Sequence, residues 1–436
     1  MLHPLKRIVY LQNKGIPRGI CSVCSANRYV IEAAMDKAIY YNSFLLIEAT
    51  ANQVNQYGGY TGMKPIDFRN FVYDIAKASD FPQDMIILGG DHIGPLVWKD
   101  EETETAMAKS CELVRELINA GFTKIHIDTS MRLLSDDRDK RLSPVYIAER
   151  GAAICKAAED EFLSYKANHP EAVAPVYIIG SEVPIPGGSM EHEDSISVTS
   201  AEDFEETLNS YREAFNKADI NNCWDNVIAV VVQPGVEFGN DFIQKYNHAA
   251  AENLTKRLKM HKNIIFEGHS TDYQSPYSLK QMVEDGIAIL KVGPALTFAL
   301  REALFELNMI EEVMYRNNNE IELSKFSAVL EAVMVEQPIY WNSYYNGSDE
   351  QVILDRMFSF SDRCRYYLPS SKVLEATQKL INNLKIKDIP LPLLSQYMPI
   401  QYRKVRDNKL RNDPEALIKD KIGEILEDYY FAVVAG

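Results

Sequence analysis

Residues 85–95 read MIILGGDHIGP, an apolar run that ends in two glycines, an acid and a histidine before a Gly-Pro turn. A continuous apolar run of this length is typical of a parallel strand that is covered on both faces. Asp91 and His92 stand where such a strand ends. An acid and a histidine at this position can be a general base with a metal ligand, or they can form a turn with the N-cap of a helix. Gly94 and Pro95 delay any helix, which weakens the N-cap alternative.

Seven more short apolar runs recur over the first three hundred residues, and helical patterns such as AMAKSCELVRELINAG lie between them. The runs are ICSVCSA from Ile20, FLLIEAT from Phe44, KIHIDTS from Lys124, VYIIGSE from Val176, VIAVVVQ from Val227, NIIFEGH from Asn263 and AILKVGP from Ala288. A doubly wound sheet would have fewer strands and a glycine-rich first turn, which is absent. Eight strand–helix units therefore predict an α/β fold of the (β/α)8 TIM barrel type.

The pattern changes after about residue 309. Residues 310–436 contain helical patterns (KFSAVLEAVMVEQ, KVLEATQKLINNL, DKIGEILEDYYFAVV) without alternating strands. The sequence therefore predicts a barrel over residues 1–309 and a helical C-terminal extension over residues 310–436. This extension is expected to pack on the barrel or to serve as an assembly surface.

Composition excludes several classes of function. The net charge of −16 argues against nucleic acid or an anionic membrane as the main partner. Six cysteines without disulfide-scaffold spacing fit a reducing compartment. No signal peptide is recognisable at the start and no apolar run is long enough to span a bilayer, so we expect a soluble cytoplasmic protein.

Polar side chains lie at or beside the end of every predicted strand. They are Ser25, Asn27, Glu48, Asn52, Gln53, Asp91, His92, Asp128, Glu182, Gln233, His269 and Lys291. Strand ends are often polar, but barrel enzymes place their chemistry at this edge. Two histidines and several carboxylates at one barrel mouth are what a divalent metal or a proton-transfer site requires.

His92 and His269 are expected to face each other across the mouth as neutral metal ligands. Asp91 is the natural general base, because a carboxylate beside a metal-held hydroxyl can take its proton. The alternative is that each histidine only bonds a neighbouring loop. His126 lies two positions before Asp128 and deeper in the barrel, so a barrel-interior or packing role is favoured for it.

A second corner of the mouth has the features of a phosphate site. The glycine-led turn at Gly293 opens a helix after the eighth strand, where barrels commonly bind phosphate on backbone N–H groups. The residues expected to bind substrate or phosphate are Asn27, Glu48, Asn52, Gln53, Ser270, Thr271, Asp272, Lys291, Gly293 and Thr297. On spacing alone, a polar turn with a buried proline is an equally good explanation.

Nine motifs, in order along nearly the whole chain, resemble one family. They are SVCSANRYVIEAA, IEATANQVNQYGGYTGM, GGDHIGP, IHIDTSM, GSEVPIPGG, VVQPGVEFG, EGHSTDYQ, LKVGPALTFALREALF and FSFSDRCRYYLP. They closely resemble the tagatose-bisphosphate aldolase non-catalytic (Z) subunit family, which is related to the metal-dependent class II aldolases. The resemblance implies a barrel that handles phosphorylated ketohexoses.

The resemblance also implies roles for single residues. Asp91 matches the general acid/base of class II aldolases, and His92 and His269 match two zinc ligands. Glu182 and Asp128 match carboxylates on the fifth and fourth strands and are expected to be catalytic with Asp91, and Glu182 can also complete the metal shell. At the sixth strand the catalytic enzymes have a further histidine, whereas this chain has Gln233, a poor substitute on zinc.

Two functions follow from the resemblance. The first is a subunit of tagatose-1,6-bisphosphate aldolase, needed for the activity and stability of a separate catalytic class II subunit in tagatose 6-phosphate or galactitol-type catabolism. The second is an autonomous 4-epimerase that interconverts fructose 6-phosphate and tagatose 6-phosphate by retro-aldol and aldol steps with Zn, Mn or Co.

Gln233 in place of the histidine favours the subunit. A purely non-catalytic subunit would need no metal. An oligomer is expected. The partners are then the catalytic subunit and a phosphorylated ketohexose. A kinase is poorly supported, because no glycine-rich nucleotide loop is present.

Overall fold

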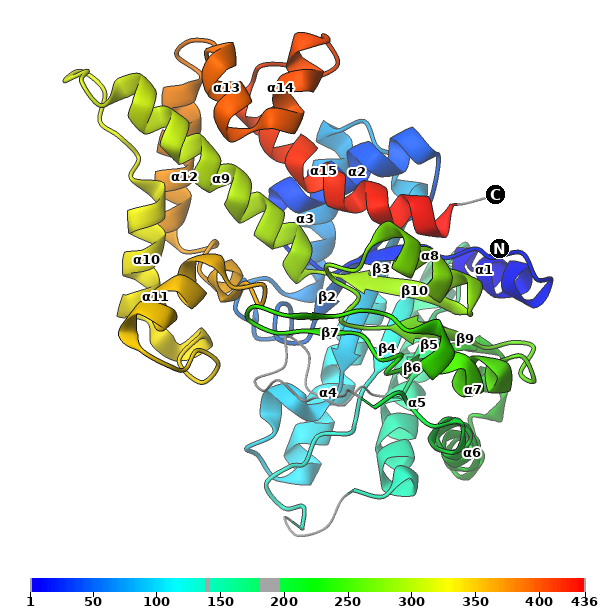
Figure 1. The fold of residues 1–436 in the computed structure, drawn as a ribbon. Coiled ribbons are helices and arrows are strands. Elements are labelled where there is room, and N and C mark those ends of the chain that lie inside the picture. Colours follow the sequence, from blue (N-terminus) through cyan, green and yellow to red (C-terminus); the bar gives the residue numbers. More distant parts are fainter. Residues whose placement is uncertain (1, 138–141, 181–196, 435–436) are drawn as a thin grey trace.

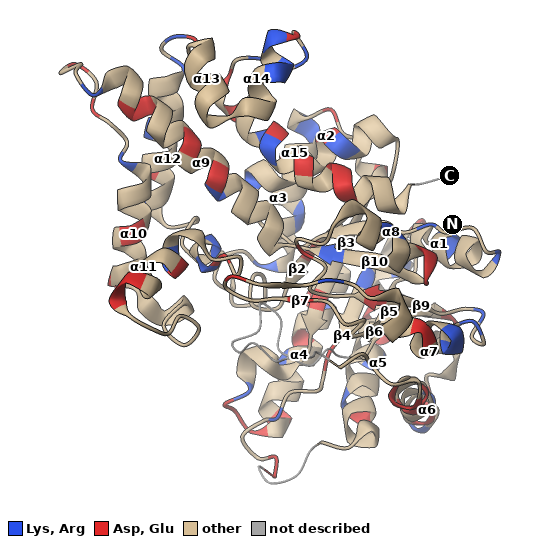
Figure 2. Cartoon of the chain, viewed as in Figure 1, with Lys and Arg blue, Asp and Glu red and all other residues tan. Residues whose placement is uncertain are grey.

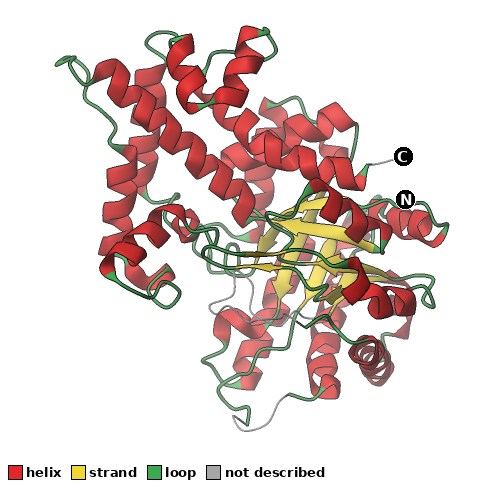
Figure 3. Ribbon diagram, in the orientation of Figure 1, coloured by secondary structure: helices red, strands yellow, loops and turns green. Residues whose placement is uncertain are grey.

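The computed structural model describes residues 2–137, 142–180 and 197–434, and the strands it contains close into a parallel barrel (Figure 3). The barrel strands are β1 (Ile20–Val23), β2 (Leu45–Thr50), β3 (Ile86–Ile93), β4 (Lys124–Ile127), β5 (Val176–Ile179), β6 (Val227–Val232), β9 (Ile265–Gly268) and β10 (Ile287–Val292). Their order around the barrel is β1-β10-β9-β6-β5-β4-β3-β2. All eight predicted strands are thus confirmed, and β7 (Glu237–Phe238) and β8 (Ile243–Gln244) add a small antiparallel hairpin.

A helix follows each barrel strand, as the apolar periodicity predicts. These helices are α2 (Arg28–Tyr41), α3 (Pro65–Ala78), α4 (Thr103–Asn119), α5 (Pro144–Asn168), α6 (Ala201–Lys217), α7 (His248–Leu258), α8 (Pro276–Glu284) and α9 (Pro294–Tyr315). Short 3-10 turns are η1 (Gln83–Met85), η2 (Pro95–Trp98), η3 (Asn221–Asn226), η4 (Pro338–Tyr340) and η5 (Arg363–Tyr366). The Gly-Pro turn does delay the helix after β3, since α4 begins only at Thr103.

The barrel interior is filled in layers. At the amino ends of the strands, Leu5 and Val9 of α1 (Pro4–Asn13) join strand residues such as Leu46 in an apolar cluster. Residues two apart on a strand face the same side, so each strand contributes to successive interior layers. The layer above the apolar cluster consists of polar side chains. Gly89 makes room for one of them, since a Cβ there would lie 2.6 Å from Cγ of Glu48.

The C-terminal extension is helical, as predicted, and it returns to the barrel (Figure 1). Its helices are α10 (Phe326–Glu336), α11 (Asp349–Phe358), α12 (Ser371–Leu384), α13 (Leu391–Tyr397), α14 (Pro399–Arg406) and α15 (Pro414–Val433). The expected boundary at residues 309 and 310 falls inside α9, which runs through it without a break. The division into two domains therefore stays a prediction.

The last helix, α15, covers the barrel face between α2 and α8 and also contacts β1 and α9 (Figure 1). Tyr429 of α15 donates a hydrogen bond to the carbonyl oxygen of Thr271 at 2.9 Å. The carbonyl of Val433 accepts from the amide of Gly19 at 3.2 Å, just before β1. Helix α15 therefore completes the helical layer around the barrel next to β1.

Acidic and basic residues are interspersed over the outer helices (Figure 2), although 62 Asp and Glu outnumber 46 Lys and Arg in the sequence. Across the part of the chain that the structure describes, every helix is too short or too polar to cross a lipid bilayer.

Candidate functional site

A bulge in β3 presents Asp91 and His92 to the barrel interior. Between its pairing positions Gly90 and Ile93, β3 holds one residue more than β4 does over the same interval. Such bulges bend a strand and re-aim its side chains. His92 has a φ of 50°, in the left-handed region, and its Nδ1 lies 2.9 Å from Oδ2 of Asp91.

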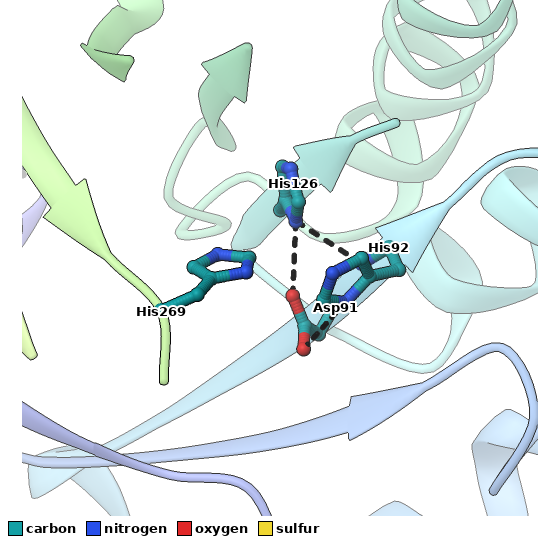
Figure 4. A group of neighbouring side chains, drawn as sticks. All are labelled: Asp91, His92, His126 and His269. Atoms are coloured by element: carbon teal, nitrogen blue, oxygen red, sulfur yellow. Dashed lines mark hydrogen bonds and ion pairs between the residues drawn. The ribbon is translucent and has the colours of Figure 1, made fainter. Parts of the chain in front are cut away.

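Three imidazoles surround the Asp91 carboxylate (Figure 4). The ring centroids of His92, His126 and His269 are 4.9 to 5.1 Å apart, and each ring comes from a different strand or strand end. Nδ1 of His126 lies 2.9 Å from Oδ1 of Asp91, and its Nε2 lies 3.0 Å from the carbonyl of Gly180. His126 therefore belongs to the cluster and is more than a packing residue.

A charged layer lies directly below the histidines. Nζ of Lys124 is 2.8 Å from Oε2 of Glu48 and 2.7 Å from Oε2 of Glu267, and all three side chains are 0% exposed. Lys291 bridges upward, with its Nζ against Asp91 and 3.5 Å from Oε2 of Glu48. Burial alone would lower the pKa of Lys124, but Glu267 and Glu48 hold it above its usual value.

These five groups make two cations and three carboxylates, which leaves one excess negative charge in the interior. A buried uncompensated charge is costly, so another cation is favoured here. Burial would lower the pKa of His126, but its hydrogen bond to Asp91 raises it above the usual value. An imidazolium at His126, or a bound metal ion, can balance the charge.

Neighbouring groups keep Asp91 ionised, and burial keeps His269 neutral. Burial would raise the pKa of Asp91, but His92, Lys291 and His126 hold it well below its usual range. Burial lowers the pKa of His269 far below its usual value, even though Glu267 accepts from its ring. A carboxylate and a neutral imidazole are the forms that bind a metal.

The donor set fits a divalent metal ion. One ligand atom from each of Asp91, His92, His126 and His269 lies within 4.8 Å of the others, and all four residues are buried. Glu267 Oε1 lies 3.0 Å from Nε2 of His269, the carboxylate–histidine arrangement that orients metal ligands. When bound, a metal ion there would supply Lewis-acid polarisation of a ligand oxygen.

A cavity of about 740 Å³ opens above the histidines, and residues of the C-terminal extension close part of it. The barrel contributes Asn52, Gln53, Tyr60, Asp91, His92, His269, Ser270, Asp272, Lys291 and Gly293, among others, and the extension contributes Ile339, Tyr344, Arg363, Arg365 and Tyr366. Six of the ten residues expected to bind substrate therefore line one cavity: Asn52, Gln53, Ser270, Asp272, Lys291 and Gly293. Their contact with a ligand stays a prediction.

The other four expected substrate contacts point elsewhere. Asn27 caps α2 by accepting from the amide of Tyr29 at 3.0 Å, and Glu48 lies in the charged interior layer. The hydroxyl of Thr271 donates to the carbonyl of Lys291 at 2.6 Å. That of Thr297 donates to Asp362 at 2.6 Å.

Gln233, expected as a metal ligand, and Asp128, expected to be catalytic, have side-chain oxygens bound within their own turns, and their roles stay predictions. Oε1 of Gln233 accepts from the amides of Gly235 and Val236 at 2.8 and 2.9 Å, so this oxygen faces its own turn rather than the histidines. Asp128 accepts from the amide and hydroxyl of Ser130, and is not among the cavity-lining residues. The third predicted carboxylate, Glu182, lies outside the described residues.

Sequence reasoning missed two contributions to the site. His126 was expected in the barrel interior or in packing, without a part in the site, whereas the bulge in β3 leaves both Asp91 and His92 opposite it. Arg363 and Arg365 were part of a quoted motif without a role. The one signal in the sequence was that two arginines, separated by a single residue, precede Tyr366 in a chain that is acidic overall.

The fold and its buried imidazole–carboxylate cluster define a (β/α)8 barrel protein with a candidate metal site at the mouth. A profile of the family described as D-tagatose-1,6-bisphosphate aldolase subunit GatZ/KbaZ-like matches residues 5–434. The chain belongs to this family.

Two relatives extend over nearly the full length. The D-tagatose-1,6-bisphosphate aldolase subunit GatZ of Klebsiella pneumoniae is 44% identical over 427 residues, which cover 98% of each chain. The crystal structure of a probable tagatose 6 phosphate kinase from Sinorhizobium meliloti 1021 is 43% identical with a TM-score of 0.86, over 95% of this chain and 100% of that one. The second likeness supports the barrel together with its extension.

Proposed function

We propose that this chain is the non-catalytic subunit of a D-tagatose-1,6-bisphosphate aldolase, and that it raises the activity and stability of a separate catalytic class II subunit in an oligomeric complex. The observation that carries the proposal is the 44% identity to the Klebsiella subunit over 98% of both chains.

The geometry at Asp91 supports a non-catalytic role. A general base works best when its pKa lies near the working pH. His92, Lys291 and His126 hold the pKa of Asp91 well below its usual range, so it accepts a proton poorly. Gln233 stands where catalytic class II aldolases have a histidine, and its Oε1 is bound to its own loop.

A metal ion in the imidazole cluster would then have a structural role, and zinc, manganese or cobalt are the candidates. It would neutralise the excess negative charge of the interior layer and fix the three rings. The autonomous 4-epimerase is not favoured, because it needs Asp91 as an effective base.

The test measures triose release from tagatose 1,6-bisphosphate by the catalytic subunit of the same organism, with and without this chain. We expect no cleavage by this chain alone with any of the three metals, and a clear rise in the partner's rate and thermal stability when it is added. The variant D91N should stimulate the partner as the wild type does.

The opposite pattern would establish an enzyme. Conversion of fructose 6-phosphate to tagatose 6-phosphate by the chain alone, abolished in D91N and H92A, would replace the subunit proposal with the epimerase. A partner whose rate and stability are unaffected by this chain would also overturn it.

A further inference from the structure

The C-terminal extension places two guanidinium groups at the cavity. Arg363 and Arg365 line it together with Tyr344 and Tyr366. Including these arginines, the lining holds four Lys or Arg residues (Lys99, Lys291, Arg363, Arg365) against three Asp residues (Asp91, Asp100, Asp272). The balance of charge in the cavity is therefore opposite to that of the chain, whose net charge is −16.

The loop that carries the arginines is fixed to the barrel through Asp362. Asp362 accepts from the hydroxyl of Thr297 at 2.6 Å, and its Oδ1 lies 3.5 Å from Nε of Arg301, both residues of α9. Its backbone has a φ of 46°, in the left-handed region, where a non-glycine residue needs such support. The loop is therefore held in one conformation by the barrel's own helix.

A second set of contacts holds the residues just before Asp362. The amide of Phe360 donates to the carbonyl of Asn240 at 2.9 Å, and Oδ1 of Asn240 accepts from the hydroxyls of Ser359 and Ser361. Tyr273 donates to the carbonyl of Phe360 at 2.6 Å. Preorganised groups of this kind bind a ligand without first having to be ordered.

Arg365 keeps binding capacity that the interior lysines lack. Its Nη1 donates to the carbonyls of Ser361 and Asp362, and its Nη2 lies 3.0 Å from the hydroxyl of Tyr366. Among residues 2–137, 142–180 and 197–434, no carboxylate forms an ion pair with it within 4.0 Å. Burial would lower its pKa, but Tyr366 and the more distant Asp362 hold it above the usual value. Burial would raise the pKa of Tyr366, but Arg365 and Arg363 bring it below its usual value, which shows how positive this corner is.

The usual anion site of a barrel is already filled here. The amides of Gly293 and Ala295, at the start of α9, donate to Oδ1 of Asp272 at 3.0 and 2.8 Å. A phosphate at that helix start would have to displace the chain's own carboxylate. Lys291 is likewise surrounded by Asp91 and Glu48. Besides Lys99, the cavity-lining cations that the described residues leave are the arginines of the extension, and of these Arg365 carries the argument.

We propose that Arg365, with Arg363 beside it, binds the phosphate group of a phosphate monoester whose remainder extends toward the histidine cluster. Planar guanidinium groups pair with phosphate oxygens in a fork-like geometry and are the preferred side chains for this task. The subsite goes beyond the proposed subunit role, which requires no ligand in this cavity.

The test is isothermal titration calorimetry on the full chain without its partner. The ligands are tagatose 6-phosphate, tagatose and inorganic phosphate. We expect tagatose 6-phosphate to bind and tagatose to bind at least tenfold more weakly. R365Q should weaken binding of the phosphate ester at least tenfold, and R365K should restore part of it. R411Q, at an exposed arginine of the same extension, is the control and should bind as the wild type does.

Two further outcomes are decisive. D272N removes a neighbouring negative charge and should tighten binding several-fold, which gives a gain that a misfolded variant cannot produce. Equal affinity of R365Q and wild type, or equal binding of tagatose and tagatose 6-phosphate, would overturn the subsite. Neither result changes the rate of the partner, so the subunit proposal is tested separately.

Discussion

The middle of the barrel and the roof of its cavity both hold buried cations, but the two regions pair them differently. In the middle, Lys124 lies within 2.9 Å of oxygens from both Glu48 and Glu267. In the roof, Arg365 is held by backbone carbonyls and by Tyr366. A buried cation whose charge is balanced by carboxylates stabilises the fold. One that is held mainly by neutral groups can still attract an anion.

Among the tests of this comparison, the variant K124M has the largest expected effect on stability. It would leave Glu48 and Glu267 buried with Lys291 as the one lysine near both in the described residues, at 3.5 and 3.9 Å, and removing one partner of a buried pair typically costs about 3–5 kcal/mol. We expect the free energy of unfolding, measured with urea, to fall by that amount.

K156M is the matched control, because the pair of Lys156 with Asp160 is about half exposed. Its effect should stay within about 0.5 kcal/mol. If K124M unfolded at the wild-type urea concentration, the interior layer would not be a closed network.

A carboxylate at the mouth gives a second test, through pH. Burial raises the pKa of Glu237 to about 7, although the amide of Phe238 and the hydroxyl of Ser270 donate to it. Its raised pKa favours the folded state at low pH, and that advantage is lost as the pH rises from the unfolded value through 7. Between pH 5 and pH 8 the wild type should therefore lose about 2–3 kcal/mol more stability than E237Q.

This difference isolates one group, because all other titrations are shared by the two proteins. Parallel stability curves for wild type and E237Q would mean that Glu237 is solvated and that the mouth is wetter than its buried side chains indicate.

The histidine cluster lies between the two regions and gives the smallest expected effect. H126A removes one of three imidazoles, and its zinc affinity, measured by competition with a chromogenic chelator, should fall about tenfold or more. H169A changes an exposed histidine and is the control. If H126A bound zinc as tightly as the wild type while H92A did not, His126 would serve only to hold Asp91 and Gly180 in place.

Local pattern was enough to predict the barrel and part of its mouth. Strand ends could be read from apolar runs, so Asp91, His92, His269 and Lys291 were correctly expected to lie together. His126 was expected deeper in the barrel, but its part in the cluster could not be predicted, because a bulge of one residue, which leaves both Asp91 and His92 opposite it, does not change the apolar pattern of the strand.

Side-chain direction and long-range packing were the other limits. Gln233 and Asp128 sit at strand ends, but hydrogen bonds to neighbouring residues decide where their polar atoms point. Arg365 reaches the mouth only because Asp362 is bound by α9, a contact between residues 65 positions apart. No periodicity in the sequence reports such a contact.

The position of α15 has a consequence for biosynthesis. The helix that covers β1 is translated long after that strand, and the carbonyl of Val433 accepts a hydrogen bond from the amide of Gly19. Until residues 414–433 emerge, the nascent barrel exposes the apolar surface between α2 and α8 that a chaperone can recognise. A nonsense codon just before residue 414 would thus remove the cover of the first strand, so the codons for α15 protect a barrel that was translated long before them.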